Sequence, residues 1–562
     1  MSNSIWNKRL SVAAAFIIIL GSILCFRLFQ KQVLEHNAYS VLAENQYMVK
    51  EAIPAQRGNI YASDMFPLAT NVQYYQILVV PRNIKNPDEV ASKLSPLLLM
   101  DKDEIFDQIN NNKVYLPPLK HGLTEQEGDK IASLKISGVT ILPESSRIYP
   151  ENELAAHILG FVNKEGDGQY GIEGYYNEEL KGYGGELSAE QDIKGRLFSV
   201  GEKIEPKNGS DYVLTIDHTV QYQAEQILQS SVKKYNADSG SIVIADPKTG
   251  AILAMAGSQT YDPNKYNEVS KEDQDVFNNP VITNAWEPGS IFKPLIMAAA
   301  INENKVQPDT TQVFGSSVKV DSYEIHTSTN QAYGKETMTQ VLENSDNVAM
   351  VWVSQQLGKE TEYQYMKSFG FGRKTGIEMA TEAEGKVDDV KKWSDTQAAT
   401  ISFGQGITVT PIQLTAAIGS IANGGSLMKP YIVSEVRDAN GQVDKRQAQE
   451  VKQVLSQDTA RKVKDMMVSV VVNGHGKKAA VAGYKVAGKT GTAQVPKPGG
   501  GYYEDRHIGS FVGFAPADDP KFVMLVRLDQ PKNVDWAESS AAPTFGEMTK
   551  WLLQYYRVAP TQ

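Results

Sequence analysis

The sequence predicts an α+β protein with one membrane-spanning helix near its N-terminus, and three observations lead to this prediction. Residues 10–30 form an apolar run that contains a single charge, at Arg27. Residues 240–258 and 507–529 each hold two apolar, strand-like runs around a turn that contains Asp and Pro. Long apolar helix patterns lie between and after these two stretches. Hairpins with helices between them favour an antiparallel sheet flanked by helices over a parallel βαβ array.

The N-terminal apolar run is long enough to cross a bilayer, because about 20 helical residues span roughly 30 Å. Lys8 and Arg9 precede it, as expected for an anchor with positive charge on the cytoplasmic side. We expect residues 1–9 in the cytoplasm, a single-pass anchor at 10–30 in the plasma membrane, and the remaining chain outside. The apolar run is not followed by the Ala-x-Ala pattern of a cleaved signal peptide. Cys25 follows a residue that is too large for the lipid-modified cysteine of a lipoprotein signal. A buried core helix is the remaining alternative.

Composition limits the function classes. The 562 residues suggest three or four domains, and 22% charged with 41% hydrophobic residues is ordinary for a folded globular chain. A net charge of −10 without any block of Lys or Arg argues against a nucleic-acid partner. The single cysteine excludes an intrachain disulfide, and with 7 His a Cys/His zinc site is not expected. We expect neither a metal nor another cofactor.

The exported part divides by pattern into a mixed region at 31–230 and a second domain at 231–562. In the first region, residues 41–64 predict a strand and a turn, and 88–109 predict two short helices. Glycines recur at short intervals in residues 153–186, which indicates turns and close backbone packing. No cluster of catalytic side chains occurs there, so the sequence predicts a non-catalytic domain followed by a catalytic one.

Three apolar segments of the second domain predict helices, at 291–303, 338–358 and 410–425. The start of the third is well specified, because Thr410 and Gln413 form a capping-box pattern and a proline occupies the first helical position.

Ser290 and Lys293 are the strongest candidates for chemistry. Residues three apart share one face of a helix, so the amine can reach the hydroxyl and activate it as a nucleophile. A serine at the start of a helix also lies in the positive field of the N-terminal amides. Lys293 precedes a proline, which disfavours the helical conformation for that lysine.

The same spacing of Ser and Lys occurs in less suitable surroundings. Two matches lie at what we predict to be the solvated end of a helix. The third lies in a strand pattern, where side chains three apart point to opposite faces. These matches are Ser230 with Lys233, Ser231 with Lys234, and Ser316 with Lys319.

A second candidate group is Ser345–Asn347. Its serine can relay a proton, and its asparagine amide can hold both Lys293 and a substrate carbonyl. A polar patch on a helix is the alternative interpretation. A rival match at Ser328–Asn330 lies in a polar, loop-like stretch without an apolar frame.

The third candidate is a Lys-Thr-Gly sequence, which occurs three times. The copy at Lys248 lies in a predicted hairpin turn, and the copy at Lys374 follows a glycine-rich stretch typical of a loop. The copy at Lys489 continues a strand, with alternate side chains on opposite faces. Its lysine and hydroxyls suit recognition of a carboxylate, and a small glycine lets a ligand approach the strand. The candidate binding residues are Lys489, Thr490, Gly491 and Thr492.

Together, these three motifs in this order resemble the penicillin-recognising serine transferases, and the whole chain resembles class B penicillin-binding proteins. Segments of the first region are similar to the family's non-catalytic pedestal, although Ala62 and Ser63 displace the acid that usually follows the segment Arg57–Tyr61. The segment Ala155–Gly160, followed by a GxGxxGIE pattern, resembles division-type members more than elongation-type members. The segments are Arg57–Tyr61, Arg147–Pro150, Ala155–Gly160 and Gly171–Glu173.

The resemblance implies a fold and a mechanism. Residues 31–230 would be a pedestal and 231–562 a transpeptidase domain. Ser290 would attack the penultimate D-alanine carbonyl of a peptidoglycan stem peptide, and a second stem's amine would complete the cross-link during septal wall synthesis. Lys293 would activate the serine, Ser345 would pass protons, Asn347 would bind a substrate amide, and Lys489, Thr490 and Thr492 would hold the terminal carboxylate. The backbone amides of Ser290 and Thr492 would form the oxyanion hole.

The resemblance also implies partners: stem peptides, β-lactams, a SEDS-type glycan polymerase in the membrane, and other division or elongation proteins. Elongation-type cross-linking is the nearest alternative. A D,D-carboxypeptidase, a β-lactamase and a β-lactam sensor share the motifs, but a β-lactamase is usually about half this length. A sensor would need more than the roughly nine cytoplasmic residues expected here.

Overall fold

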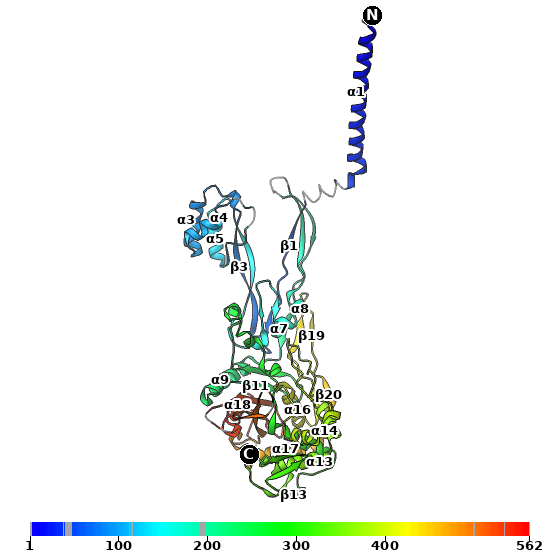
Figure 1. Ribbon diagram of the computed structural model, residues 1–562. Coiled ribbons are helices and arrows are strands. Elements are labelled where there is room, and N and C mark those ends of the chain that lie inside the picture. The colour runs from blue at the N-terminus through cyan, green and yellow to red at the C-terminus, as the bar shows by residue number, and fades with distance from the viewer. Residues whose placement is uncertain are drawn as a thin grey trace. The chain divides into compact units, whose positions relative to one another are not determined.

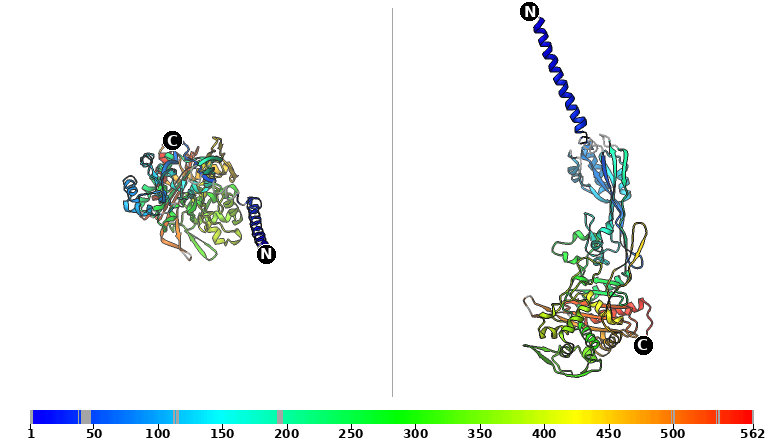
Figure 2. Two further views of the ribbon diagram at one scale, coloured as in Figure 1. Left: turned by 90° about the horizontal axis from the view of Figure 1, so that it is seen from above. Right: turned by 90° about the vertical axis from the view of Figure 1, so that its right-hand side faces the viewer.

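The structure is a computed structural model that describes residues 3–37, 39, 48–111, 113, 116–191, 197–497, 499, 501–532, 534 and 536–560. Its internal contacts divide the chain into two units. The first combines 1–56 with 182–209, and the second combines 57–181 with 210–562. Figures 1 and 2 show the elements of both units.

The first unit begins with helix α1 (Asn3–Phe29), which continues into a π-helical turn (Gln30–Leu34). The helix Ile5–Leu34 contains an 18-residue stretch with a mean hydropathy of 2.5, none of which is buried; no second helix in the described part of the chain is long and apolar enough to cross a membrane. The predicted apolar helix is therefore confirmed, and its length and exposure fit a single-pass membrane anchor.

A three-stranded antiparallel sheet completes the first unit. Strand β8 lies in its centre, with Val49 of one neighbour opposite Ala189. The chain leaves this unit after the first strand and returns for the other two. The strands are β1 (Met48–Ile53), β8 (Gly185–Gln191) and β9 (Leu197–Ile204).

The second unit contains a seven-stranded sheet of order β19-β18-β10-β2-β3-β4, with β5 paired to β3. The long antiparallel β3 and β5 form a ribbon in Figure 1, and a small helical cluster packs beside it. The strands are β2 (Ile60–Tyr61), β3 (Pro67–Val79), β4 (Lys120–Leu123), β5 (Val139–Ile148), β10 (Asp211–Leu214), β18 (Val433–Arg437) and β19 (Val443–Lys445).

The helical cluster confirms the two short helices predicted at 88–109. Asn86 and Asp101 cap them by accepting hydrogen bonds from free amides of the first turn. Leu94 and Ile105 are fully buried in a small separate core. The helices are α3 (Pro87–Leu98), α4 (Lys102–Ile109) and α5 (Glu125–Ser133), with a 3₁₀ turn at Pro81–Asn83.

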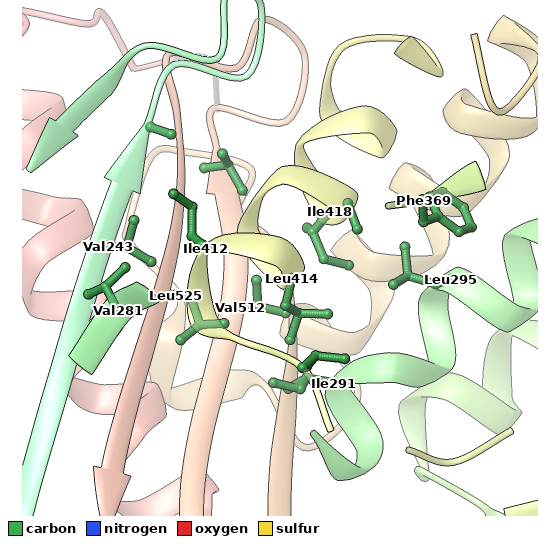
Figure 3. Close-up of a cluster of buried hydrophobic side chains, with 14 of the residues drawn as sticks. Val243, Val281, Ile291, Leu295, Phe369, Ile412, Leu414, Ile418, Val512 and Leu525 are labelled. Carbon is green, nitrogen blue, oxygen red and sulfur yellow. The ribbon is translucent and has the colours of Figure 1, made fainter. Parts of the chain in front are cut away.

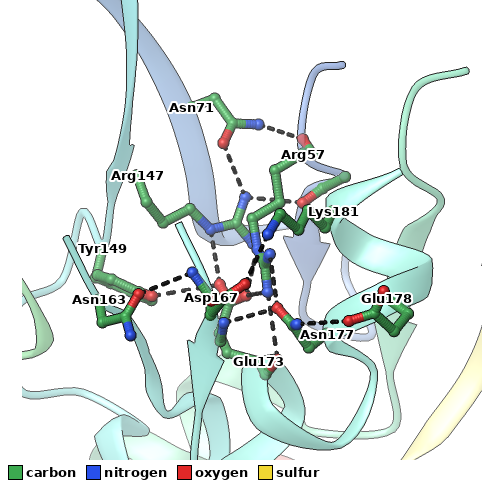
Figure 4. Close-up of polar contacts among 12 residues, drawn as sticks. Arg57, Asn71, Arg147, Tyr149, Asn163, Asp167, Glu173, Asn177, Glu178 and Lys181 are labelled. Atoms are coloured by element: carbon green, nitrogen blue, oxygen red, sulfur yellow. Dashed lines mark hydrogen bonds and ion pairs between the residues drawn. The ribbon is translucent and has the colours of Figure 1, made fainter. Parts of the chain in front are cut away.

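Short elements between 156 and 181 surround a buried carboxylate, Glu173 (Figure 4). Its oxygens accept hydrogen bonds from Arg57 Nε and Arg147 Nε, each at 2.7 Å. A Cβ added to Gly168 would lie 1.9 Å from the Glu173 carbonyl oxygen, so the close packing predicted for the glycines is confirmed. The elements are α6 (Ala156–Leu159), β6 (Phe161–Val162), β7 (Gly168–Gln169), α7 (Gly171–Tyr175) and α8 (Asn177–Lys181).

The rest of the second unit is built on a five-stranded antiparallel sheet of order β12-β11-β23-β22-β21. Both predicted hairpins are confirmed, since β11 pairs with β12 and β22 with β23, and Val243 lies opposite Leu525 where the two hairpins meet. The strands are β11 (Ser239–Ala245), β12 (Ile252–Gly257), β21 (Ala487–Pro496), β22 (Tyr502–Ala515) and β23 (Phe522–Asp529).

Helices cover both faces of this sheet, which confirms the α+β prediction. Helices α9 (His218–Tyr235) and α18 (Ala541–Tyr555) bury one face in a core that includes Phe511 and Phe545. Helices α11 (Lys293–Asn302) and α16 (Pro411–Ala422) lie on the other side, where Figure 3 shows apolar side chains from helices and strands interlocking. The capping box at Thr410 is present as predicted.

Further short elements surround the two faces. The helices are α10 (Pro280–Thr283), α12 (Met338–Glu343), α13 (Asn347–Leu357), α14 (Lys359–Ser368), α15 (Asp395–Ile401) and α17 (Gln457–Val472). The 3₁₀ turns are Pro263–Glu268, Gln274–Phe277, Gly289–Phe292, Val390–Lys392, Lys477–Ala479 and Ala537–Ser539. Three two-stranded ribbons pair β13 (Thr311–Phe314) with β16 (Gly334–Thr337), β14 (Ser317–Val320) with β15 (Tyr323–His326), and β17 (Ser426–Met428) with β20 (Glu450–Gln453).

The single helix predicted at 338–358 is wrong, because the chain forms α12, a turn and then α13. Ser345 has a φ of +54°, which is incompatible with a continuous right-handed helix. Asp346 then caps α13 by accepting a hydrogen bond from the amide of Ala349. The boundary predicted between 230 and 231 falls inside α9, and where the two domains divide stays a prediction.

Candidate active site

Ser290 lies in the 3₁₀ turn Gly289–Phe292, and Lys293 is the first residue of α11. Residues three apart eclipse one another in a 3₁₀ turn, so the two side chains share one side of the turn. Lys293 has helical angles, φ −52° and ψ −41°, despite the proline that follows it. The packing of the buried α11 therefore overrides the local preference of a residue before proline.

A second glycine-rich turn holds the serine turn in position. The amide of Gly289 donates to the carbonyl oxygen of Gly404 at 3.0 Å. A Cβ on Gly404 would lie 2.2 Å from the Gly289 carbonyl oxygen, and Gly404 also has a φ of +81°. Only glycine allows this contact. The sequence analysis missed this role, although the glycines of the stretch 402–406 were a signal for it.

The Lys293 side chain is fully buried and bonded to the second motif. Its Nζ donates to the Ser345 carbonyl oxygen at 2.6 Å and to Asn347 Oδ1 at 2.7 Å, and it lies 3.2 Å from Ser345 Oγ. Asn347 Nδ2 in turn donates to the His326 carbonyl oxygen at 3.2 Å, which turns the amide oxygen toward the lysine. The left-handed turn at Ser345 thus brings the first and second motifs together.

Lys489 enters the same cluster from β21, the strand at the edge of the sheet. This side chain is also fully buried. Its Nζ donates to Ser345 Oγ at 3.0 Å and to the Thr490 carbonyl oxygen at 3.1 Å. The Ser345 hydroxyl therefore lies between two amines, within hydrogen-bonding distance of each, which is the geometry a proton relay requires.

Both lysines are shifted toward the neutral amine. Burial holds the pKa of Lys293 well below its ordinary value of 10.5, and the nearby charge of Lys489 lowers that pKa further, while Asp346 and Glu336 oppose the shift. Burial lowers the pKa of Lys489 to about 7. A neutral amine beside a serine hydroxyl can accept its proton, so this arrangement can generate a nucleophile.

A cavity of about 1470 Å³ opens onto this cluster. Among its lining residues are Ser290, Ser345, Asn347, Thr490 and Thr492, so residues of all three predicted motifs share one cavity. The sequence analysis missed other parts of the lining, including the β14–β15 hairpin and Phe403, because their proximity exists only in the folded chain. The described residues include no group of three or more His, Cys, Asp and Glu side chains placed to hold a metal ion.

The glycine of the third motif packs closely against the serine turn, and its predicted role toward a ligand stays a prediction. A Cβ on Gly491 would lie 2.9 Å from Ile291 Cγ2 and 3.1 Å from the Pro288 carbonyl oxygen. The missing side chain thus lets the strand pack against the serine turn. Thr490 is buried, and Thr492 Oγ1 accepts a hydrogen bond from the amide of Ala537 at 3.1 Å.

The rival matches lie apart from this cluster. The Lys-Thr-Gly copy at Lys248 lies in a turn and the copy at Lys374 lies in a loop, and both lysines are exposed. Ser316 precedes β14, as the strand pattern predicted, and Ser328 lines the cavity but is exposed in a loop. One prediction is wrong: Ser231 is not solvated, because it faces α18 and its Oγ accepts a hydrogen bond from Thr544 Oγ1 at 2.9 Å.

Two hydrogen bonds to the Glu287 carboxylate, which the sequence did not predict, lie just before the nucleophile in the chain. Tyr502 OH donates to Glu287 Oε2 at 2.8 Å, and the amide of Gly406 donates to Glu287 Oε1 at 2.9 Å. Burial, and after it the Glu287 carboxylate, raises the pKa of Tyr502, which keeps its hydroxyl a donor. Glu287 thereby ties the start of β22 and the glycine turn to the residues just before Ser290.

Two family profiles match the chain. The penicillin-binding protein dimerisation domain matches residues 52–214, and the penicillin-binding protein transpeptidase domain matches residues 240–550. The chain belongs to the class B penicillin-binding proteins. The predicted resemblance is confirmed, and this penicillin-binding protein is a peptidoglycan D,D-transpeptidase of the serine, β-lactam-binding family.

Its similarity to known members extends along the whole chain. The penicillin-binding protein is 34% identical to stage V sporulation protein D of Bacillus subtilis over 100% of this chain and 88% of that one. It is 31% identical to a probable peptidoglycan D,D-transpeptidase, PbpC, of Pseudomonas aeruginosa over 100% and 97% of the two chains. The crystal structure of penicillin-binding protein 3 from Mycobacterium tuberculosis, complexed with aztreonam, matches with a TM-score of 0.72 at 26% identity, over 91% and 98% of the chains.

Proposed function

We propose that this transpeptidase forms its acyl-enzyme on Ser290. The Oγ attacks the carbonyl carbon of the penultimate D-alanine, the hydroxyl proton passes to Lys293, and the terminal D-alanine leaves as an amine that takes a proton back. A second stem peptide's amine then attacks the ester, which releases Ser290 and forms the cross-link. The observation that carries the proposal is the Lys293 amine, buried one turn from the serine and hydrogen-bonded to no carboxylate of the described residues.

Ser345 would relay protons between the two lysines. Its hydroxyl lies 3.2 Å from Lys293 Nζ and 3.0 Å from Lys489 Nζ. A hydroxyl can donate and accept at once, so it can return a proton toward the leaving amine while the lysines change charge. Asn347 would contribute its amide to a substrate carbonyl from the same wall of the cavity.

Lys489, Thr490 and Thr492 would hold the terminal carboxylate of the donor peptide. Charge-assisted bonds to a carboxylate are about twice as strong as neutral ones, and this strand supplies one amine and two hydroxyls. The backbone amides of Ser290 and Thr492 would form the oxyanion hole, because both residues line the cavity beside the reacting carbonyl. Gly491 would act through packing, since it lets this strand approach the serine turn.

β-Lactams would acylate the same serine. The related Mycobacterium tuberculosis structure contains aztreonam, a β-lactam, on a chain of the same fold. A β-lactam carries an amide next to an anionic group, so it presents to the site the same two features as a D-alanyl-D-alanine end.

Product analysis tests the reaction type. The full-length protein, in detergent, receives a stem-peptide donor and an excess of a free amine. We expect a new amide between the two, together with released D-alanine. A free acid as the only product would favour a carboxypeptidase, and turnover of penicillin faster than of peptide would favour a β-lactamase. Acylation of the protein without release of any product would favour a β-lactam sensor.

For the cellular role we propose septal wall synthesis, with residues 1–9 in the cytoplasm and the catalytic domain outside. The GxGxxGIE pattern at 166–173 supports a division-type member. A role in sporulation is the second candidate, because the Bacillus subtilis relative bears that name. Elongation is the third. A SEDS-type glycan polymerase and other division proteins would be partners of the anchor and pedestal.

Depletion of the protein in its own cells separates these roles. Filaments without septa would support division, rounded cells would support elongation, and normal growth with defective spores would support sporulation. A pull-down through a tag on the cytoplasmic N-terminus tests the partner: recovery of a multi-spanning membrane protein is expected. Labelling of that tag by an impermeant reagent in intact cells would contradict the orientation.

A further inference from the structure

Two buried carboxyl groups lie together behind the second motif. Glu336 of β16 is 2% exposed, and Asp346 of the Ser345–Asn347 turn is fully buried. Glu336 Oε1 accepts a hydrogen bond from Asn344 Nδ2 at 2.8 Å, and Asp346 Oδ1 accepts one from the amide of Ala349 at 3.1 Å. The second oxygen of each group, Glu336 Oε2 and Asp346 Oδ2, is buried and receives no hydrogen from any other described group.

A single proton shared between the two carboxyl groups gives both of these oxygens a hydrogen-bond partner. The two side chains lie within hydrogen-bonding reach of each other, and ionised carboxylates can only accept, so one must be protonated to bond the other. Two carboxylates at such a distance cannot both ionise readily, because their charges repel in a low dielectric. Burial, followed by the proximity of Asp346 and Glu343, raises the pKa of Glu336 to about 7. Glu336 is therefore the member that keeps the proton.

We propose that Glu336 is a positioning residue for the reaction: its protonated carboxyl donates to Asp346 Oδ2, fixes the Ser345–Asn347 turn and limits the negative charge behind Lys293. This inference rests on the proposed role of Lys293 as the base. Asp346 connects the two effects, because it both caps α13 and belongs to the turn that bonds the lysine.

The charge effect has a definite direction. The charged groups that face this pair are Glu343 at the end of α12 and Lys293 at the start of α11, and Lys489 faces that lysine from β21. Negative charge on Glu336 or Asp346 raises the pKa of Lys293 and so favours the ammonium form, which cannot accept a proton. Loss of the shared proton at rising pH therefore opposes the deprotonation of Lys293 that the same rise promotes.

Glu336→Gln and Glu336→Leu separate the two effects. The glutamine amide donates to Asp346 as the protonated acid does, but it never ionises. We expect Glu336→Gln to acylate with a fluorescent penicillin within about 3-fold of the native rate at pH 6, and to gain rate more steeply than the native protein above pH 7. Glu336→Leu leaves Asp346 Oδ2 without a donor, and we expect about a 10-fold to 100-fold slower acylation, as for loss of a buried hydrogen bond to a charged group.

Glu362→Gln is the matched control. Glu362 is fully buried in α14, burial raises its pKa to about 8, and its oxygen accepts from Ser354 Oγ. It is therefore another protonated glutamic acid, outside the cavity lining, and its variant should keep the native rate and pH profile. Melting temperatures of all variants show whether each one folds.

Identical pH profiles for the native protein and Glu336→Gln would overturn the inference, and so would native acylation by a folded Glu336→Leu. If Glu336→Leu does not fold, the profile of Glu336→Gln alone decides. Failure of the proposed function is distinguishable, because Ser290→Ala would then still be labelled by penicillin. Unlabelled Ser290→Ala together with unaffected Glu336 variants would refute only the role of Glu336.

Discussion

Two clusters of buried charged side chains in the second unit differ in one respect, which is whether the charges are paired. In the Glu173 cluster the carboxylate is fully buried and bonded to two guanidinium groups, from Arg57 and Arg147. In the active-site cluster Lys293 and Lys489 are equally buried, but their hydrogen bonds go to hydroxyl, carbonyl and amide oxygens.

The consequence is a difference in reactivity. A paired buried charge resists titration, and removal of one partner leaves an uncompensated charge that costs several kcal/mol. An unpaired buried amine loses its proton instead, because neutralisation costs less than burial of the charge. The first arrangement stabilises a junction of short elements, while the second keeps two amines able to exchange protons. Burial alone does not identify a catalytic group; the two lysines differ because they combine burial without a counter-ion with a position beside Ser345, which lines the cavity.

Lys293→Met should give the largest effect. It removes the proposed base and leaves an apolar side chain of similar length. We expect acylation by a fluorescent penicillin to fall about 10²-fold to 10⁴-fold, as for loss of a general base, with a melting temperature equal to or above the native one. Stopped-flow labelling and a thermal scan measure both. A rate within 10-fold of native would remove the base role from this lysine.

Glu173→Gln should show the opposite pattern. The change removes the charge between two buried guanidinium groups, and we expect the free energy of unfolding to fall by about 3–5 kcal/mol. The acylation rate of the folded fraction should stay within about 2-fold of native, because the cluster lines no part of the active-site cavity. A lower melting temperature with normal labelling confirms the contrast. An unchanged melting temperature would mean that the pairing contributes little.

Lys489→Met should have an intermediate effect on the reaction. We expect acylation by a penicillin that bears the carboxylate to slow about 10-fold to 100-fold, the range for loss of one charge-assisted bond. An ester of the same penicillin should lose much less. Equal acylation of the acid by native and variant proteins would remove carboxylate recognition from Lys489.

The pH dependence of stability gives the smallest effect. The pKa of Lys489 is about 7 in the folded protein and ordinarily 10.5, so between these values the unfolded chain binds more protons. Native stability should therefore rise with pH relative to Lys489→Met, by about 1 kcal/mol from pH 7 to pH 8, and stay level below pH 6. Melting temperatures of the two proteins across pH 6–9 measure this difference. A constant difference would show that Lys489 stays charged in the folded state.

Local patterns predicted much of this fold from the sequence. The two hairpins, the capping box at Thr410 and the helices at 88–109 follow from periodicity and capping chemistry. The N-terminal apolar helix follows from an apolar run that contains a single charge. Ser290, Ser345 and Lys489 were singled out because their motifs have fixed spacing and suitable flanking patterns, and residues of all three motifs line one cavity.

Features that depend on the tertiary arrangement were missed. The break at Ser345 was not predicted, because the apolar periodicity continues through 338–358 while the left-handed turn is imposed by packing. Gly404 is required by a contact with a turn more than a hundred residues earlier, and burial of Ser231 depends on α18. Glu336 has an ordinary polar context in the sequence, and only its neighbour Asp346 gives it a role.

The most direct test of the central claim is the site of the covalent adduct. The full-length native protein is labelled with a fluorescent penicillin, digested, and mapped by mass spectrometry beside Ser290→Ala, Ser230→Ala and Ser231→Ala. The account predicts one adduct, on the peptide that contains Ser290, lost in Ser290→Ala and retained in the other two variants. An adduct that persists in a folded Ser290→Ala, or that maps to another serine, would contradict it.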